Sequence, residues 1–182
     1  AAAATYNVTV TDTATGGPAV KVPATSVKIK KPSSTTLNKG KTLTLVAIMA
    51  PSNPTDTLTW KTTKHKVATV ADGKVKAVNK GTATITVTTT SGKKASIKVT
   101  VKIPAKKVKL SKKKATLKVG KTLKLKATKT PANSTDKLTW KTSNKKIATV
   151  KNGKVKAKKK GKVTITVKTQ SGKTAKCKIT VK

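Results

Sequence analysis

An internal repeat is the feature that most constrains the fold of this chain. Residues 37–102 align without gaps with residues 117–182 at an offset of 80, and 40 of these 66 positions are identical. Upstream, residues 27–29 match residues 108–110 at an offset of 81. Because a fixed period indicates a repeated structural unit, we predict a first domain at 24–103 and a second at 104–182. A short arm, or the end of a preceding domain, occupies residues 1–23.

Apolar and polar residues alternate along most of each unit. Leu123, Leu125 and Ala127 alternate with lysine or threonine, and residues 164–167 and 176–181 follow the same rule. Glycine, asparagine and proline interrupt these runs at short intervals. A period of two indicates strands with one buried face, so we predict six or seven short strands per unit. Such strands form an all-β, antiparallel sandwich, and the short Ile103-Pro104 connection predicts an elongated, semi-rigid tandem.

Several short motifs of the second unit resemble the bacterial immunoglobulin-like domain of group 2. They are Leu138 to Asn144 (LTWKTSN), Ile147 to Val150, Asn152-Gly153, Gly161 and Thr164 to Val167, and the first unit repeats them around Trp60, Val67 to Val70, Asp72-Gly73 and Gly81. The resemblance covers about 160 of the 182 residues. It implies two tandem immunoglobulin-like domains that act as spacers or adhesion modules, as in intimin- and invasin-like surface proteins and phage structural proteins. It implies neither catalysis nor a fixed ligand.

Groups that carry catalysis or bind metals are scarce. The chain has one histidine, one cysteine, four aspartates and no glutamate. His65 lies in a predicted loop, Cys177 falls on the apolar face of its strand, and Asp56 and Asp136 precede the tryptophan strands, where we expect them to cap turns. We therefore expect a non-enzymatic protein with no catalytic residue, no metal site and no cofactor.

Aromatic residues are also few. Trp60 and Trp140 occupy equivalent positions in the strand that carries the core tryptophan of immunoglobulin-like folds, so we assign both to the cores. Tyr6 is the remaining aromatic residue, and the chain contains no arginine. Without stacking platforms or guanidinium groups, specific recognition of nucleic acid is not expected. Non-specific binding to nucleic acid stays open as the weakest alternative.

Lysine dominates the composition. The 43 basic residues are all lysine and give a net charge of +39. Residues 24–104 hold 15 lysines and two aspartates, a net charge of +13, whereas residues 105–182 hold 27 lysines and one aspartate, a net charge of +26. Outward positions of the first unit are replaced by lysine in the second at Lys124, Lys126, Lys137, Lys168 and Lys176. These five lysines are either a solvated surface or an electrostatic coat that binds anionic polymers.

The first unit has apolar residues where the second has polar ones. Val46, Ile48 and Met49 stand where the second unit has lysine or threonine, which predicts a small exposed apolar patch. Together with Tyr6, whose segment 6–11 has the pattern of a strand, this patch marks the first half as the end that docks onto a scaffold, capsid or envelope protein.

The hypothesis that follows is an extracellular, surface-displayed structural and adhesion module on a bacterial envelope or a phage particle. Within such an assembly it would be able to form a homo-oligomer. The opening AAAATYNV lacks the features of a signal peptide, which slightly favours the phage particle. A passive mechanical spacer, with lysines for solubility only, is the alternative. No apolar run approaches the ~18 residues of a membrane span.

Overall fold

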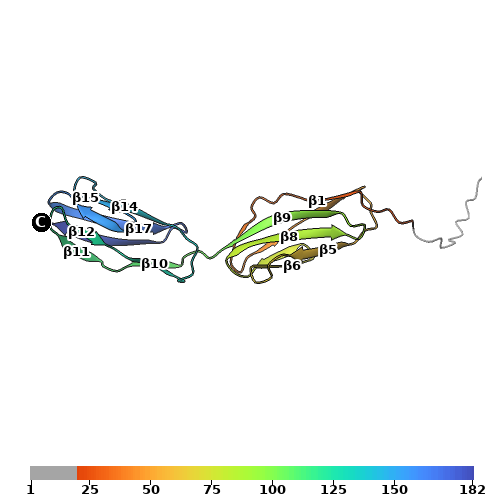
Figure 1. Ribbon diagram of the computed structural model, residues 1–182, viewed down its shortest axis with the longest axis horizontal. Helices are drawn as coiled ribbons and strands as arrows, with labels where there is room; N and C mark the ends of the chain where they lie inside the picture. The colour runs from red at the N-terminus through yellow and green to blue at the C-terminus, as the bar shows by residue number, and fades with distance from the viewer. Residues whose placement is uncertain (1–19) are drawn as a thin grey trace, which may run out of the picture.

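The computed structural model describes residues 20–182 and shows two β-sandwiches arranged end to end (Figure 1). Nine strands lie in the first: β1 (Ser26–Ile29), β2 (Thr36–Asn38), β3 (Thr42–Thr44), β4 (Ala47–Ala50), β5 (Leu58–Thr62), β6 (Ala68–Ala71), β7 (Lys74–Ala77), β8 (Gly81–Thr89) and β9 (Lys94–Lys102). Nine lie in the second: β10 (Lys107–Leu110), β11 (Lys114–Leu117), β12 (Thr122–Lys124), β13 (Ala127–Thr130), β14 (Leu138–Thr142), β15 (Ala148–Lys151), β16 (Lys154–Ala157), β17 (Gly161–Thr169) and β18 (Thr174–Val181). No helix long and apolar enough to cross a membrane occurs in this part of the chain.

Both sandwiches share one topology. In the second, the four-stranded sheet β11-β18-β17-β14 forms one layer, and the smaller sheets β12-β16-β15 and β10-β13 form the other. The first domain repeats this as β2-β9-β8-β5 against β3-β7-β6 and β1-β4. The predicted all-β fold of two tandem immunoglobulin-like sandwiches is confirmed. Strands number nine per domain rather than six or seven, because two long strands of the pattern are each broken into two short ones.

The first long strand of each domain changes sheets, and this is where the purely antiparallel prediction needs amending. β10 pairs antiparallel with β13, but β11, which follows it, pairs parallel with β18. The same exchange links β1 and β2 in the first domain. The polar residues between the paired strands carry the chain from one layer to the other.

Small aliphatic side chains fill the space between the layers. The second core contains fully buried Leu125, Val155 and Ile165, and the first contains Val75, Ile85 and Val99 at matching depths. Cys177 lies in the second core with no exposed surface, as its place in the alternation predicts. Burial raises the pKa of this thiol against the opposing influence of nearby Lys112, so the thiol stays protonated and packs as an apolar group.

A tight hairpin in each domain explains why tryptophan and glycine recur together in both repeats. Asn152 and Gly153 join β15 to β16 with φ of 47° and 81°, the left-handed values that a two-residue hairpin requires. The Gly153 carbonyl accepts a hydrogen bond of 2.8 Å from the Leu125 N–H. A Cβ at Gly153 would overlap the Leu125 carbonyl oxygen and lie 3.1 Å from Cζ2 of Trp140. Trp140, partly buried, packs against the core, so the missing side chain leaves room for the indole.

We predict that Gly153→Ala destabilises the second domain more than Gly120→Ala does. Gly120 also has a positive φ, 82°, but no atom lies within 4 Å of its absent side chain. Both substitutions incur the left-handed penalty of about 1–2 kcal/mol, and Gly153→Ala adds overpacking of about 1–3 kcal/mol. Urea unfolding followed by Trp140 fluorescence, in a Trp60→Phe background, measures both. Equal losses for the two variants would contradict this packing role.

The connection between the domains has no free residue. The Lys102 carbonyl accepts a 2.8 Å hydrogen bond from Lys39 N–H in the first domain. The next residue, Ile103, is already held in the second domain, because its carbonyl accepts a 2.8 Å hydrogen bond from the Thr135 N–H and its own N–H donates to Thr135 Oγ1 at 3.0 Å. Ile103 is also buried. These contacts favour the semi-rigid tandem expected from the sequence.

The same joint occurs at the start of the first domain. Residues 20–24 (VKVPA) repeat residues 101–105 (VKIPA) almost identically, and Val22 accepts a 2.8 Å hydrogen bond from the Thr55 N–H. These residues are not part of a sheet. The rest of the predicted N-terminal arm, including Tyr6 and the strand at 6–11, lies outside the described residues.

Candidate anion-binding surface

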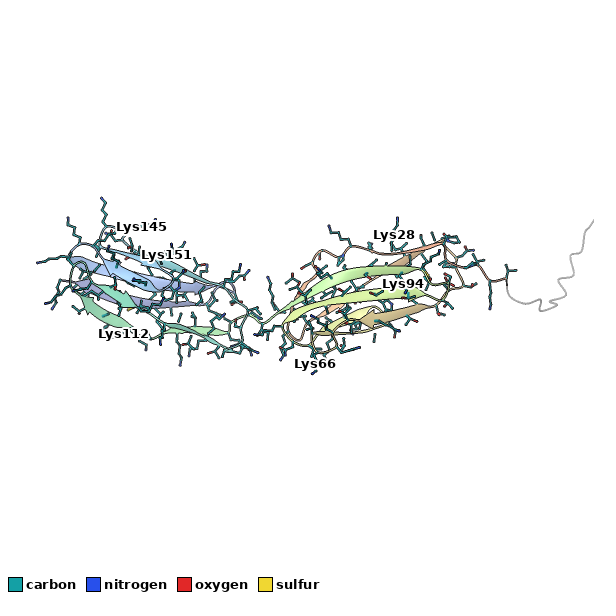
Figure 2. The ribbon with its side chains drawn as sticks, in the orientation of Figure 1. Lys28, Lys66, Lys94, Lys112, Lys145 and Lys151 are labelled. Atoms are coloured by element: carbon teal, nitrogen blue, oxygen red, sulfur yellow. The ribbon has the colours of Figure 1, made fainter. Side chains whose placement is uncertain are left out.

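Lysine side chains project from both sandwiches. Figure 2 shows Lys28, Lys66 and Lys94 on the first domain and Lys112, Lys145 and Lys151 on the second, all directed away from the cores. The burial pattern explains this, because strand positions that alternate with the aliphatic core residues face solvent. Every lysine of the predicted coat, Lys124, Lys126, Lys137, Lys168 and Lys176, is exposed.

The structure divides these five lysines between the two layers. Lys124 ends β12 and Lys126 follows it, so both belong to the layer that contains β12-β16-β15. Lys168 and Lys176 lie on β17 and β18 of the opposite layer, and Lys137 directly precedes β14 at its edge. Because they lie on two layers, the five lysines do not form one site. The differences between the repeats indicate which lysines are exposed, but not which of them lie close together.

Register places other lysines in rows that the sequence comparison did not reveal. Lys154 of β16 stands opposite Lys124 on one side and Lys151 on the other. The first domain has Thr44, Lys74 and Ala71 at these positions. Like charges directly opposite one another destabilise a sheet, and a bound anion would relieve that repulsion. Lys124 Nζ also donates a 3.0 Å hydrogen bond to the Asn152 carbonyl, which fixes one end of the row.

Lys129 makes two hydrogen bonds within its own domain. Lys129 Nζ donates hydrogen bonds to the carbonyls of Ser134, at 2.7 Å, and Asp136, at 2.6 Å. Its first-domain equivalent is Met49, whose side chain has no donor for these hydrogen bonds. Lys129 is therefore a structural cation and not part of an anion-binding coat.

The predicted docking patch is smaller than the sequence suggested. Val46 and Ile48 are 50% and 54% exposed, and Ile48 stands opposite Lys28 of β1. Met49 is partly buried, because it alternates with Ile48 along β4 and so points to the opposite face. The exposed apolar area of this strand thus consists of two side chains flanked by a lysine.

Asp136 joins three segments of the second domain and does more than cap a turn. Its carboxylate accepts a 2.9 Å hydrogen bond from the Ser171 N–H in the β17–β18 turn and a very short one from the Ser171 hydroxyl. Ser171 Oγ also lies 2.8 Å from the Ala105 carbonyl oxygen, at the domain joint. Asp56 repeats the arrangement with Ser91 and Ala24 in the first domain. We refer to each set as the Asp–Ser clamp.

Hydrogen bonds decide the protonation of the clamp. For Asp136, 8% exposed, burial raises the pKa, but hydrogen bonds from the Ser171 hydroxyl and N–H and from the Ala105 backbone outweigh it and lower the pKa below 3.8. The hydrogen bond from the Ser91 hydroxyl is the largest cause that lowers the pKa of Asp56. Each ionised carboxylate thus holds the joint to its own domain at neutral pH.

We predict that the clamp makes the second domain sensitive to acid. Because the folded-state pKa is lowered, its stabilisation is complete above the unfolded value near 3.8 and is lost as pH falls through the folded value. Unfolding free energies, measured between pH 2 and 7, should therefore decline below about pH 4. Asp136→Asn should be less stable at pH 7 by about 1–3 kcal/mol and lose most of this decline.

Asp72→Asn is the matched control, because the second domain has asparagine, Asn152, in the equivalent turn. This variant removes one carboxylate without touching a clamp and should retain the acid profile. If Asp136→Asn declines in acid as steeply as the unmodified chain, the clamp is not the cause.

The remaining candidate groups stay apart. His65 is exposed in the turn before β6, and within residues 20–182 no three His, Cys, Asp or Glu side chains gather in a way that could hold a metal ion. Trp60 and Trp140 are partly buried and pack against the two cores. The chemistry that this surface offers is therefore electrostatic.

Comparison with known proteins agrees with the fold. The family model for the bacterial Ig-like domain (group 2) matches residues 23–101 and 104–179. A lacto-N-biosidase of Bifidobacterium bifidum is 48% identical over 66 residues, which make up 36% of this chain and 6% of that protein. The chain thus corresponds to a small fraction of that relative.

Two solved structures are similar to this chain. The four N-terminal Ig domains of Dscam1 isoform 6.44 give a TM-score of 0.52 at 16% identity, over 88% of this chain and 47% of that one. The Yersinia pseudotuberculosis adhesin InvE gives a TM-score of 0.47 at 13% identity, over 86% of this chain and 58% of that one.

Proposed function

This chain belongs to the bacterial Ig-like domain (group 2) family, and on that basis we propose that it is a non-enzymatic structural and adhesion module displayed on a surface. Its second domain holds anionic polymers or glycans by electrostatic attraction. The observation that carries this proposal is the set of exposed lysines that gives residues 105–182 a net charge of +26. Such a density of one sign favours anionic partners and repels cationic ones.

The joints support the display role. A connection with hydrogen bonds on both sides keeps consecutive domains from collapsing onto each other, so the second domain is held away from whatever carries the first. Residues 1–23 and the first domain, with the less charged surface and the Val46–Ile48 patch, are the end that contacts a scaffold, capsid or envelope protein. The location is extracellular, on a bacterial cell surface or a virion.

The comparison with lacto-N-biosidase is consistent with a non-catalytic role. That protein's name describes a glycosidase, but the match spans 6% of its length, and a shared fold does not imply a shared activity. The joints alone equally favour a passive mechanical spacer whose lysines provide solubility. Binding experiments separate the two roles.

Charge reversal tests the proposal. We expect the variant Lys124→Glu, Lys126→Glu, Lys168→Glu and Lys176→Glu to lose at least about tenfold in affinity for immobilised teichoic acid or acidic glycan at 0.15 M salt. All four side chains are exposed, so circular dichroism and the melting temperature should confirm an intact fold. Binding of the unmodified chain should also weaken as salt is added.

The same four positions changed to arginine provide the control, since they keep the charge and should keep the binding. A reversal variant that binds as well as the unmodified chain would reject the electrostatic role and leave the passive spacer. Equal binding to a neutral polymer would reject it as well.

A further inference from the structure

The strand exchange of the second domain leaves an open edge between its layers. β10 pairs with β13 in one layer, and β11 pairs with Lys178–Val181 of β18 in the other. The first half of β18, Thr174 to Cys177, therefore has no strand on that side. A groove of about 690 Å³ runs between β10 and this free edge. Its existence follows from topology and cannot be read from the spacing of lysines along the chain.

The groove combines an apolar floor with a cationic rim. Val108, Leu110 and Ala175 form the floor. Six lysines line it, and no carboxylate does: Lys107, Lys109, Lys113, Lys114, Lys176 and Lys178. Lys114 and Lys178 stand directly opposite each other in the parallel pair, an arrangement of like charges that is unfavourable until an anion lies between them.

The cationic track continues beyond the groove. A second depression of about 660 Å³ shares Lys114 and Lys178 with it and crosses the outer face of β18 and β17. There it is lined by Lys162 and by the hydroxyl-bearing side chains of Thr116, Ser143, Thr164 and Thr180. Two connected depressions with seven lysines fit several charges of a linear polyanion better than they fit one small ion.

We propose that this track, which we call the β10–β18 groove, is the binding site for a linear phosphodiester polymer with an aliphatic backbone. The proposal rests on the proposed function and gives it a location and a ligand class. Lysines neutralise successive phosphates, and the apolar floor contacts the methylene groups between them. No aromatic side chain lines either part of the track, so rings of sugars or bases find no stacking surface there.

The first domain supplies a natural negative control. It keeps the floor, as Val27, Ile29 and Ala95, but has serine in place of three rim lysines. Ser26, Ser34 and Ser96 correspond to Lys107, Lys114 and Lys176. The same sheet topology therefore occurs with and without these three charges.

The test compares two variants that each lose three charges. The groove variant is Lys107→Ser, Lys114→Ser and Lys176→Ser. The control variant, Lys118→Asn, Lys158→Val and Lys159→Asn, takes the first-domain residues at three exposed lysines that line neither part of the track. With poly(glycerol phosphate) as the probe, calorimetry at 0.15 M salt should show a loss of at least about tenfold for the groove variant and of about twofold for the control.

Restoration provides an independent readout. Adding Ser26→Lys, Ser34→Lys and Ser96→Lys to the groove variant rebuilds the rim on the first domain and should recover most of the lost affinity. Thermal unfolding of each variant checks that folding is unchanged. Failure of this transplant, with both domains folded, would show that the groove geometry is not what binds.

The outcomes separate the two proposals. If the unmodified chain binds no polyanion, the proposed function fails and this site fails with it. If both three-charge variants lose affinity equally, the electrostatic function stands and the groove is rejected. If polyuronate or duplex DNA binds as tightly as poly(glycerol phosphate) at equal charge concentration, the assignment to an aliphatic phosphodiester is overturned in favour of that class.

Discussion

Each domain depends on the contact between two layers whose facing side chains are almost all valine, isoleucine, leucine and alanine. Forty-three lysines repel one another in this chain, and few acids offset that repulsion, so burial of aliphatic surface is the main force that holds the sheets together. The alternation that buries Ile165 and Val155 is the same one that exposes the lysines beside them. The core and the charged surface thus arise from a single pattern.

The few acidic groups have correspondingly specific roles. Asp56 and Asp136 are held by serines of the last hairpin and by the backbone at the domain entrance. Each clamp thus ties the ends of its sandwich to the segment that enters it. Ile103, which lies in the joint shortly before Ala105, is also hydrogen-bonded to the second domain. The charge on the Asp136 carboxylate therefore contributes to the geometry of the tandem. This links the stability of a domain to the display of its lysines.

The internal repeat shows how one fold carries two different surfaces. The domains share their core, their hairpins and their clamps, whereas the second gains lysine at outward positions. Those replacements are tolerated because exposed strand positions contribute little to packing. Lysines such as Lys124 and Lys129 additionally hydrogen-bond to backbone carbonyls of their own domain. The additional charge of the second domain therefore lies at positions where the fold tolerates it or gains hydrogen bonds from it.

The sequence by itself determined the repeat, the all-β sandwich, the inward face of Cys177 and the asymmetry of charge, because period-two patterning and composition are local properties of the chain. It did not reveal the parallel strand pairs, the clamp between Asp136 and Ser171, or the internal contacts of Lys129. Nor did it show that Lys124 and Lys176 lie on different layers while Lys114 and Lys178 are neighbours. Those facts depend on which strands pair and in which register, and pairing is decided by contacts between residues far apart along the chain.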